Sequence, residues 1–153
     1  MNYYSKSADD TRRIGYELAE KLDTGGTKSA FVAMRGEMGV GKTAFVAGFA
    51  SYFGIVGVKS PTYAVMNQHT AACGTKIYHF DMYRIADEDD LYSIGYDDCI
   101  GAEGYALVEW SENIEYAIPD DAIYVTIERT PEDDGARKIT VDMGGDNGED
   151  TCV

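Results

Sequence analysis

Residues Arg35 to Phe45 read RGEMGVGKTAF, in which a glycine is followed, after four residues, by Gly-Lys-Thr. This spacing is typical of a loop that wraps the phosphates of a nucleotide. The apolar run at 30–34 predicts a buried strand before the loop. Three phenylalanines spaced by four predict a helix that begins near Lys42 and stops at Gly54. Strand, glycine loop and helix therefore follow one another in the order that a phosphate loop requires.

The residue types in this loop suit the binding of phosphate. Gly36, Gly39 and Gly41 let successive backbone N–H groups turn toward phosphate oxygens, and the start of the helix adds partial positive charge. Lys42 is expected to reach the β- and γ-phosphates, and Thr43 to offer its hydroxyl to Mg²⁺. The alternative is a glycine-rich turn that carries a solvated lysine. We expect ATP to contact the loop at Glu37, Met38, Gly39, Val40, Gly41, Lys42, Thr43 and Ala44.

Hydrolysis requires a further Mg²⁺ anchor and a group that positions water. Asp81 ends the apolar stretch IYHF and Glu109 ends YALV, so both carboxylates are expected at strand ends beside the phosphates. Asp81 could instead cap a turn, and Glu109 could be a solvent-facing edge residue. Pro61 fixes the backbone beside Thr62. The hydroxyl of Thr62 could join the Mg²⁺ shell or sense the γ-phosphate. Alternatively, this segment is an ordinary turn before a strand.

The other segments predict a single α/β domain over residues 1–143. An amphipathic helix is expected between its cap at Ser7 and Gly25. The remaining expected elements are a hairpin from 62–70 and 75–84, a short helix after Asp87, and strands at 105–110, 122–129 and 137–143. A polar loop at 130–136 should join the last two strands. The elements suit a P-loop NTPase-like mixed β-sheet flanked by helices, and the acidic tail 144–153 is expected to be disordered.

Composition limits the classes of partner. With 27 acidic and 13 basic residues, the net charge is -14, so the surface should repel DNA and unaided tRNA. Three cysteines without close spacing indicate neither a disulfide framework nor a zinc site. No apolar run approaches the roughly 18 residues of a membrane span. A cytoplasmic protein without a membrane partner is therefore expected.

Five segments in one order carry a more specific signal: GEMGVGKTAFVAGFA, VKSPTYAV, YHFDMYR, SIGYDD and ALVEW. Together they resemble the TsaE (YjeE) family of small P-loop ATPases, which serve tRNA threonylcarbamoyladenosine biosynthesis. The resemblance covers roughly residues 7–143. The departures from the usual family pattern, none of which removes a phosphate or Mg²⁺ ligand, lie at Glu37, Met38, Val40, Tyr63 and Ser111.

The resemblance implies roles for particular residues. Lys42 and Thr43 would bind phosphate and Mg²⁺, and Thr62 and Asp81 would complete the metal surroundings. Glu109 would be a catalytic carboxylate near the attacking water and a possible metal ligand. The expected catalytic residues are therefore Lys42, Asp81 and Glu109.

Other matched positions are less defined. Trp110 would sit near the nucleotide. Thr11 matches a position close to the adenine but is equally a first-turn helix residue. Tyr83 and Arg84 match the family motif, and Arg84 could contact phosphate, a partner or an acidic neighbour. His79 is more typical of a packed strand residue than of a base, so no role is predicted for it.

The resemblance also implies partners. ATP hydrolysis would reset an assembly of TsaD and TsaB that transfers a threonylcarbamoyl group to the adenosine beside the anticodon, and tRNA would be met only through that assembly. Weak activity is expected from the chain alone. A small-molecule P-loop kinase and a non-hydrolysing nucleotide switch remain alternatives. GTP is disfavoured because the sequence contains no Asn-Lys-x-Asp motif for reading guanine.

Overall fold

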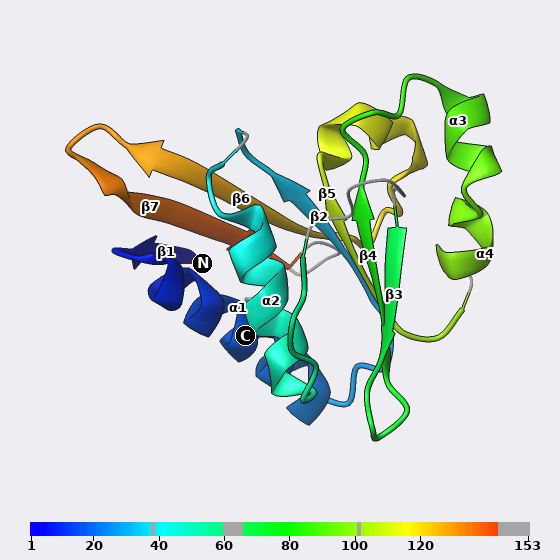
Figure 1. The fold of residues 1–153 in the computed structure, drawn as a ribbon, viewed down its shortest axis with the longest axis horizontal. Helices are drawn as coiled ribbons and strands as arrows, with labels where there is room; N and C mark the ends of the chain where they lie inside the picture. Colours follow the sequence, from blue (N-terminus) through cyan, green and yellow to red (C-terminus); the bar gives the residue numbers. More distant parts are fainter. Residues whose placement is uncertain (38, 60–65, 101, 144–153) are drawn as a thin grey trace.

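The computed structural model describes residues 1–37, 39–59, 66–100 and 102–143, and they form one α/β domain (Figure 1). The strands are β1 (Asn2–Ser5), β2 (Ala30–Arg35), β3 (Met66–Thr70), β4 (Lys76–Asp81), β5 (Tyr105–Glu109), β6 (Ile123–Thr130) and β7 (Asp133–Asp142). The helices are α1 (Ala8–Thr24), α2 (Lys42–Tyr52), α3 (Glu88–Ser93), α4 (Tyr96–Ile100) and the 3-10 helix η1 (Ser111–Ala117). The predicted α/β class with a mixed sheet flanked by helices is confirmed.

The seven strands described lie in the order β1-β7-β6-β2-β5-β4-β3. The four central strands β6, β2, β5 and β4 are parallel, whereas β1, β7 and β3 pair antiparallel toward the two edges. Continuous apolar runs explain the centre, because residues 31–34 and 105–108 are buried on both faces of the sheet. The carboxyl ends of β2, β4 and β5 consequently lie at the same end of the sheet, where Asp81 is paired in register with Glu109.

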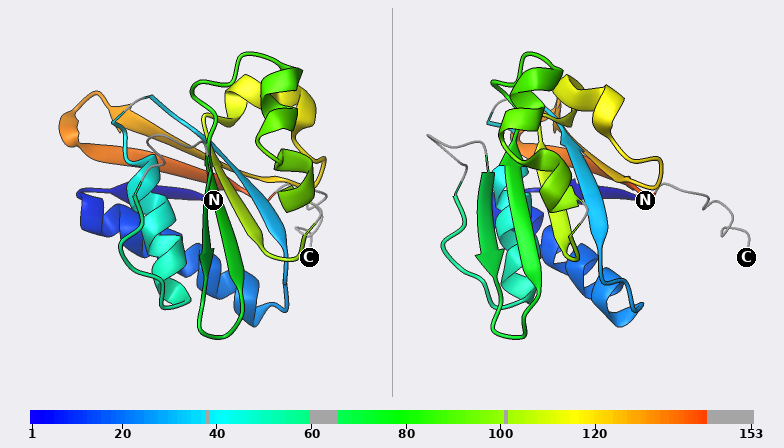
Figure 2. Two further views of the ribbon diagram at one scale, coloured as in Figure 1. Left: turned by 45° about the vertical axis from the view of Figure 1, so that its right-hand side comes forward. Right: turned by 90° about the vertical axis from the view of Figure 1, so that its right-hand side faces the viewer.

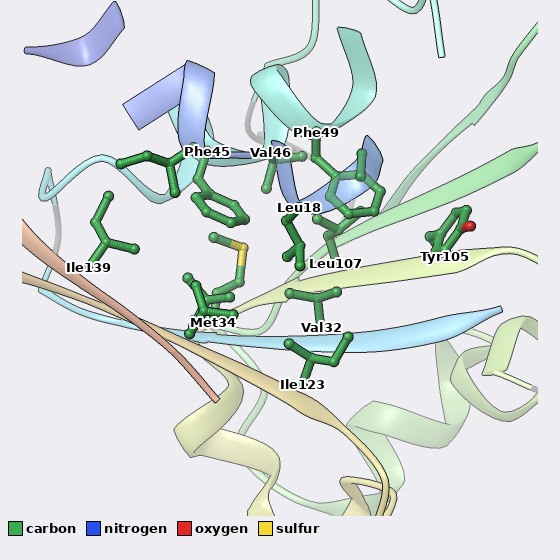
Figure 3. Packing of buried hydrophobic residues seen from close by; sticks show 14 of the residues in the cluster. Leu18, Val32, Met34, Phe45, Val46, Phe49, Tyr105, Leu107, Ile123 and Ile139 are labelled. Atoms are coloured by element: carbon green, nitrogen blue, oxygen red, sulfur yellow. The ribbon is translucent and has the colours of Figure 1, made fainter. Parts of the chain in front are cut away.

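Helices cover both faces of the sheet. On one face, Phe45, Val46 and Phe49 of α2 pack against Val32 and Met34 of β2 (Figure 3). The other face packs against α3, α4 and η1, which gather away from α1 and α2 (Figure 2). Packing between the three layers fixes the positions of β2 and α2. The glycine loop joins these two elements, so both of its ends are held.

The contact between α1 and α2 depends on two glycines. A Cβ atom added to Gly48 would lie 1.9 Å from the carbonyl oxygen of Arg12, and one added to Gly15 would lie 2.2 Å from that of Phe45. The helix backbones can approach this closely only without side chains at these positions. Ser7 caps α1 by accepting a hydrogen bond from the Asp10 N–H at 3.1 Å, as its sequence spacing predicts.

The structure corrects one predicted loop. Pairing of β6 with β7 continues to Thr130 and Asp133, so most of the polar segment 130–136 is strand, with a register shift after Arg129. The capped helix at Asp87 and the hairpin of β3 and β4 are confirmed. Strand β1 and helices α4 and η1 were not predicted. Met38, Thr62 and the tail 144–153 lie outside the described residues.

Charge is distributed unevenly over this fold. Residues 85–128 contain 13 of the 27 acidic residues and none of the 13 lysines and arginines. This segment includes α3, α4 and η1, so these helices form an acidic side of the molecule. Among the described residues, no helix has the length and apolar character needed to cross a bilayer.

Candidate active site

The loop between β2 and α2 has the backbone of an anion cradle. Gly36, Gly39 and Gly41 all adopt positive φ angles, of 150°, 77° and 118°. A Cβ atom on Gly36 would lie 2.6 Å from the carbonyl oxygen of Ile127, so the loop passes directly against β6. Gly41 is the N-cap of α2 and offers no side-chain cap. No N-cap side chain therefore occupies the start of α2, the end of a helix that attracts an anion such as phosphate.

A pocket of about 380 Å³ lies beside this loop at the carboxyl ends of the parallel strands. Its lining consists of Gly39, Gly41, Lys42, Thr43, Ala44, Asp81, Tyr83, Glu109 and Trp110. The pocket thus brings together the glycine loop, the carboxylates at the ends of β4 and β5, and the single tryptophan of the sequence. Ligands of open α/β sheets bind at this kind of edge.

Lys42 is buried, with 4% of its surface exposed. Its Nζ donates to the carbonyl oxygen of Gly36 at 2.6 Å and lies 3.9 Å from the centre of the Trp110 ring. Burial lowers the pKa of Lys42, whereas the nearby carboxylates of Glu109, Glu112 and Asp81 act in the opposite direction. A carbonyl and an indole face do not neutralise an ammonium charge, so a phosphate would be a stronger partner.

Glu109 is the centre of a hydrogen-bond cluster. Its Oε2 accepts a bond from the hydroxyl of Thr43 at 3.0 Å and lies 2.6 Å from Nε2 of His79. Both His79 and Glu109 are buried. Sequence reasoning assigned no role to His79. The available signal was its spacing, because a residue two before Asp81 in a strand projects from the same face.

Asp81 stands next to Glu109 across the β4–β5 pair. Its Oδ1 accepts a hydrogen bond from the backbone N–H of Tyr83 at 3.0 Å. Burial raises the pKa of Asp81, and the charge of Glu109 acts in the same direction, while the Tyr83 N–H and the charges of His79 and Lys42 oppose the increase. A cation beside the two carboxylates would relieve this unfavourable burial of negative charge.

The donor set fits Mg²⁺ that arrives with a nucleotide. Within the described parts of the chain, no cluster of three or more His, Cys, Asp or Glu residues forms a protein cage for a metal. The carboxylates of Asp81 and Glu109 and the hydroxyl of Thr43 nevertheless line one pocket. Mg²⁺ usually takes one or two carboxylates and completes its shell with water and phosphate oxygens. Thr62 cannot be placed in this set because it lies outside the described residues.

Trp110 has an unusual backbone. Its φ of 59° makes it the one non-glycine residue with positive φ among those described, and it precedes η1 directly. Its ring centre lies 5.1 Å from that of Tyr83, so the two rings form an aromatic wall of the pocket. Ser111, which follows, is fully buried and donates to the carbonyl oxygen of Met34 at 3.1 Å. This hydrogen bond ties the turn to β2, and no sequence signal indicated it.

Among the described residues, three of the predicted nucleotide contacts lie outside the pocket lining. Thr11 is buried and shares a 2.7 Å hydrogen bond with Ser5, and its methyl group packs beside Gly41. Glu37 is exposed and pairs with Arg129. Val40 is buried, and Arg137 donates to its carbonyl oxygen. Thr11 and Val40 thus support the loop from behind, and any contact of the three with a nucleotide stays a prediction. Arg84 is exposed and does not line the pocket.

Comparisons with known proteins agree with one another. A model of the family described as threonylcarbamoyl adenosine biosynthesis protein TsaE matches residues 5–139. The tRNA threonylcarbamoyladenosine biosynthesis protein TsaE of Treponema pallidum is 34% identical over 142 residues, which are 92% of this chain and 99% of that protein. The TsaE of Haemophilus influenzae is 38% identical over 120 residues, covering 76% of this chain and 74% of that protein.

A solved structure has the same fold. The crystal structure of YdiB from Bacillus subtilis aligns with a TM-score of 0.76 at 24% identity, covering 99% of this chain and 90% of that one.

Proposed function

Because this chain belongs to the TsaE family of tRNA threonylcarbamoyladenosine biosynthesis proteins, we propose that it is the Mg²⁺-dependent ATPase of that modification machinery. One observation carries the proposal: Lys42, Asp81, Glu109 and Trp110 surround a single pocket at the start of α2. We further propose that the chain acts with TsaB and TsaD and meets tRNA only through them.

The pocket suggests how ATP is held. The phosphates would lie on the N–H groups of the glycine loop and α2. Lys42 would leave the Gly36 carbonyl and the Trp110 face and turn its ammonium to the phosphates. Mg²⁺, when bound, would neutralise charge on the phosphates. Thr43 and Asp81, which line the pocket, would hold it.

We assign to Glu109 the activation of water. Its Oε2 already accepts two hydrogen bonds, whereas Oε1 takes none within the described residues, and Glu109 lines the pocket. A carboxylate oxygen beside a bound phosphate can orient an attacking water molecule and accept its proton. Oε1 of Glu109 is the atom that we assign to this step.

Catalysis of phosphoryl transfer commonly uses an arginine that stabilises the transition state. Among the described residues, no arginine lines the pocket. P-loop enzymes without such a group are commonly slow until a partner supplies charge or orders the site, an effect of about 10³- to 10⁵-fold where an arginine is supplied in trans. We therefore expect slow turnover by the chain alone and strong stimulation by the TsaB–TsaD assembly.

Steady-state phosphate release tests the proposal. It should be measured for the chain alone, with the cognate TsaB–TsaD assembly, and with tRNA alone, with Glu109→Gln as the inactive control. Stimulation by the assembly and not by tRNA is expected. ATP binding without stimulated hydrolysis would indicate a nucleotide switch instead, and transfer of phosphate to a small molecule would indicate a kinase.

A further inference from the structure

We propose that His79 is a positioning residue that holds the carboxylate of Glu109 in its working orientation. The inference rests on the proposed hydrolysis, and it assigns a role to a residue outside the pocket lining. His79 lies in β4, and Glu109 ends the neighbouring strand β5. The parallel register places Asp81 opposite Glu109. His79 lies two residues before Asp81 in β4, so both side chains project from the same face of the sheet.

The contact is short and shielded from water. Nε2 of His79 lies 2.6 Å from Oε2 of Glu109, and the imidazole has no exposed surface. A hydrogen bond to a carboxylate is charge-assisted, and water does not compete with one that is buried. The strand backbone fixes His79, because β4 is paired on both sides, by β3 and β5. A rigid donor of this kind can fix the direction of the carboxylate.

The two ring nitrogens of His79 have different surroundings. Nδ1 is buried and has no hydrogen-bond partner within the described chain, whereas Nε2 faces Glu109. A carboxylate only accepts hydrogen bonds, so Nε2 must carry a proton to donate to Glu109. The contact with Glu109 is therefore the one hydrogen bond of this ring among the described residues.

The role of His79 becomes clear when the second partner of Glu109 is considered. Thr43 donates to the same Oε2, at 3.0 Å. If Thr43 turns to a Mg²⁺–nucleotide complex, that hydrogen bond is lost, and His79 is the remaining described donor to Glu109. His79 would then keep Oε2 in place and leave Oε1 for the attacking water molecule.

The hydrogen bond can be tested without nucleotide by ¹⁵N NMR of the imidazole rings in the full chain. The sequence contains two histidines, so His69→Phe removes the other ring and leaves one set of signals. We expect a protonated Nε2 for His79, and a shift of the Nε2 signal in Glu109→Gln. An unprotonated Nε2, or no response to Glu109→Gln, would overturn the proposal.

Kinetics test the functional role. With the TsaB–TsaD assembly, His79→Phe should lower kcat by about 10- to 100-fold, because a catalytic group loses its orienting partner. The KM for ATP and the affinity measured by calorimetry should change less than about threefold, because loss of a transition-state interaction affects kcat first. His79→Gln should recover most of the rate, because its amide N–H reaches about as far as Nε2. His69→Phe is the matched control and should behave as wild type.

The outcomes separate the two proposals. If the assembly stimulates the wild-type chain and His79→Phe is equally active, the positioning role is wrong while the ATPase assignment stands. A His79→Gln variant as slow as His79→Phe would also overturn it. If the wild-type chain is not stimulated, the proposed function fails, and the NMR measurement still decides whether His79 holds Glu109.

Discussion

Lys42 combines nearly complete burial with a positive charge whose contacts are a carbonyl oxygen and an aromatic face. Lys42→Ala should weaken ATP binding by about 10- to 100-fold, the equivalent of one hydrogen bond to a charged group. Isothermal titration calorimetry with Mg²⁺ and ATP measures the change. Lys28→Ala, an exposed lysine outside the pocket, is the control. Unchanged affinity in Lys42→Ala would remove the basis for the phosphate site.

Asp81 should reduce the stability of the nucleotide-free protein. Burial raises the pKa of Asp81 above its ordinary 3.8, so the folded state binds the proton more tightly than the unfolded state does. Ionised Asp81 is therefore unfavourable at neutral pH. We expect Asp81→Asn to unfold at a temperature a few degrees higher at pH 7 in EDTA, while it binds Mg²⁺–ATP more weakly. A lower unfolding temperature would contradict this assignment.

The pH dependence of this difference has a definite sign. The higher unfolding temperature of Asp81→Asn should be fully present above the raised pKa of folded Asp81. The difference from wild type should decrease as the pH falls toward 3.8 and be absent below that value. Thermal unfolding of both proteins across this range measures it. A difference that grows toward acid pH would show that another group is responsible.

Single residues were predictable to different degrees. Asp81 and Glu109 could be placed because each ends an apolar run, and parallel strands end at a common edge. The contact between His79 and Glu109 was not predicted, because it depends on which strands are neighbours and on their register. Neither property can be predicted from the sequence of β4 alone.

At the scale of secondary structure, the α1–α2 contact sets the position of the loop. Gly48→Ala should lower the free energy of unfolding by about 1–3 kcal/mol, because its Cβ would overlap the backbone of Arg12. Alanine is the better helix former by about 1 kcal/mol, so the steric effect must exceed that preference. Urea denaturation measures the loss. Glu20→Ala, on the exposed face of α1, is the control, and equal stability of the two variants would contradict the contact.

Whole elements were predicted where the pattern of apolar residues was clear. Helix α1, strand β2 and helix α2 have clear apolar patterns, and all three are present. Strand β1 has only four residues and is held by backbone pairing with β7, which leaves no periodic signal. For the same reason the acidic start of β7 looked like a loop, although its backbone pairs with β6.

At the scale of the whole molecule, the net charge of -14 predicts that the chain binds tRNA only weakly. Filter binding at about 0.15 M salt should show an affinity weaker than roughly 10⁻⁴ M, because no counterions are released from the nucleic acid. Lowering the salt should not produce tight binding, because repulsion increases as screening falls. Micromolar binding by the isolated chain would contradict the view that tRNA is met only through partners.

The acidic side formed by α3, α4 and η1 makes the molecule an electrical dipole as well as a polyanion. A dipole in the field of a charged object experiences a torque, so it turns before the two surfaces touch. A positively charged partner would be met by these helices first, at separations within about one Debye length, roughly 8 Å at physiological salt. The direction of approach is thus built into the distribution of charge along the chain, in advance of any contact.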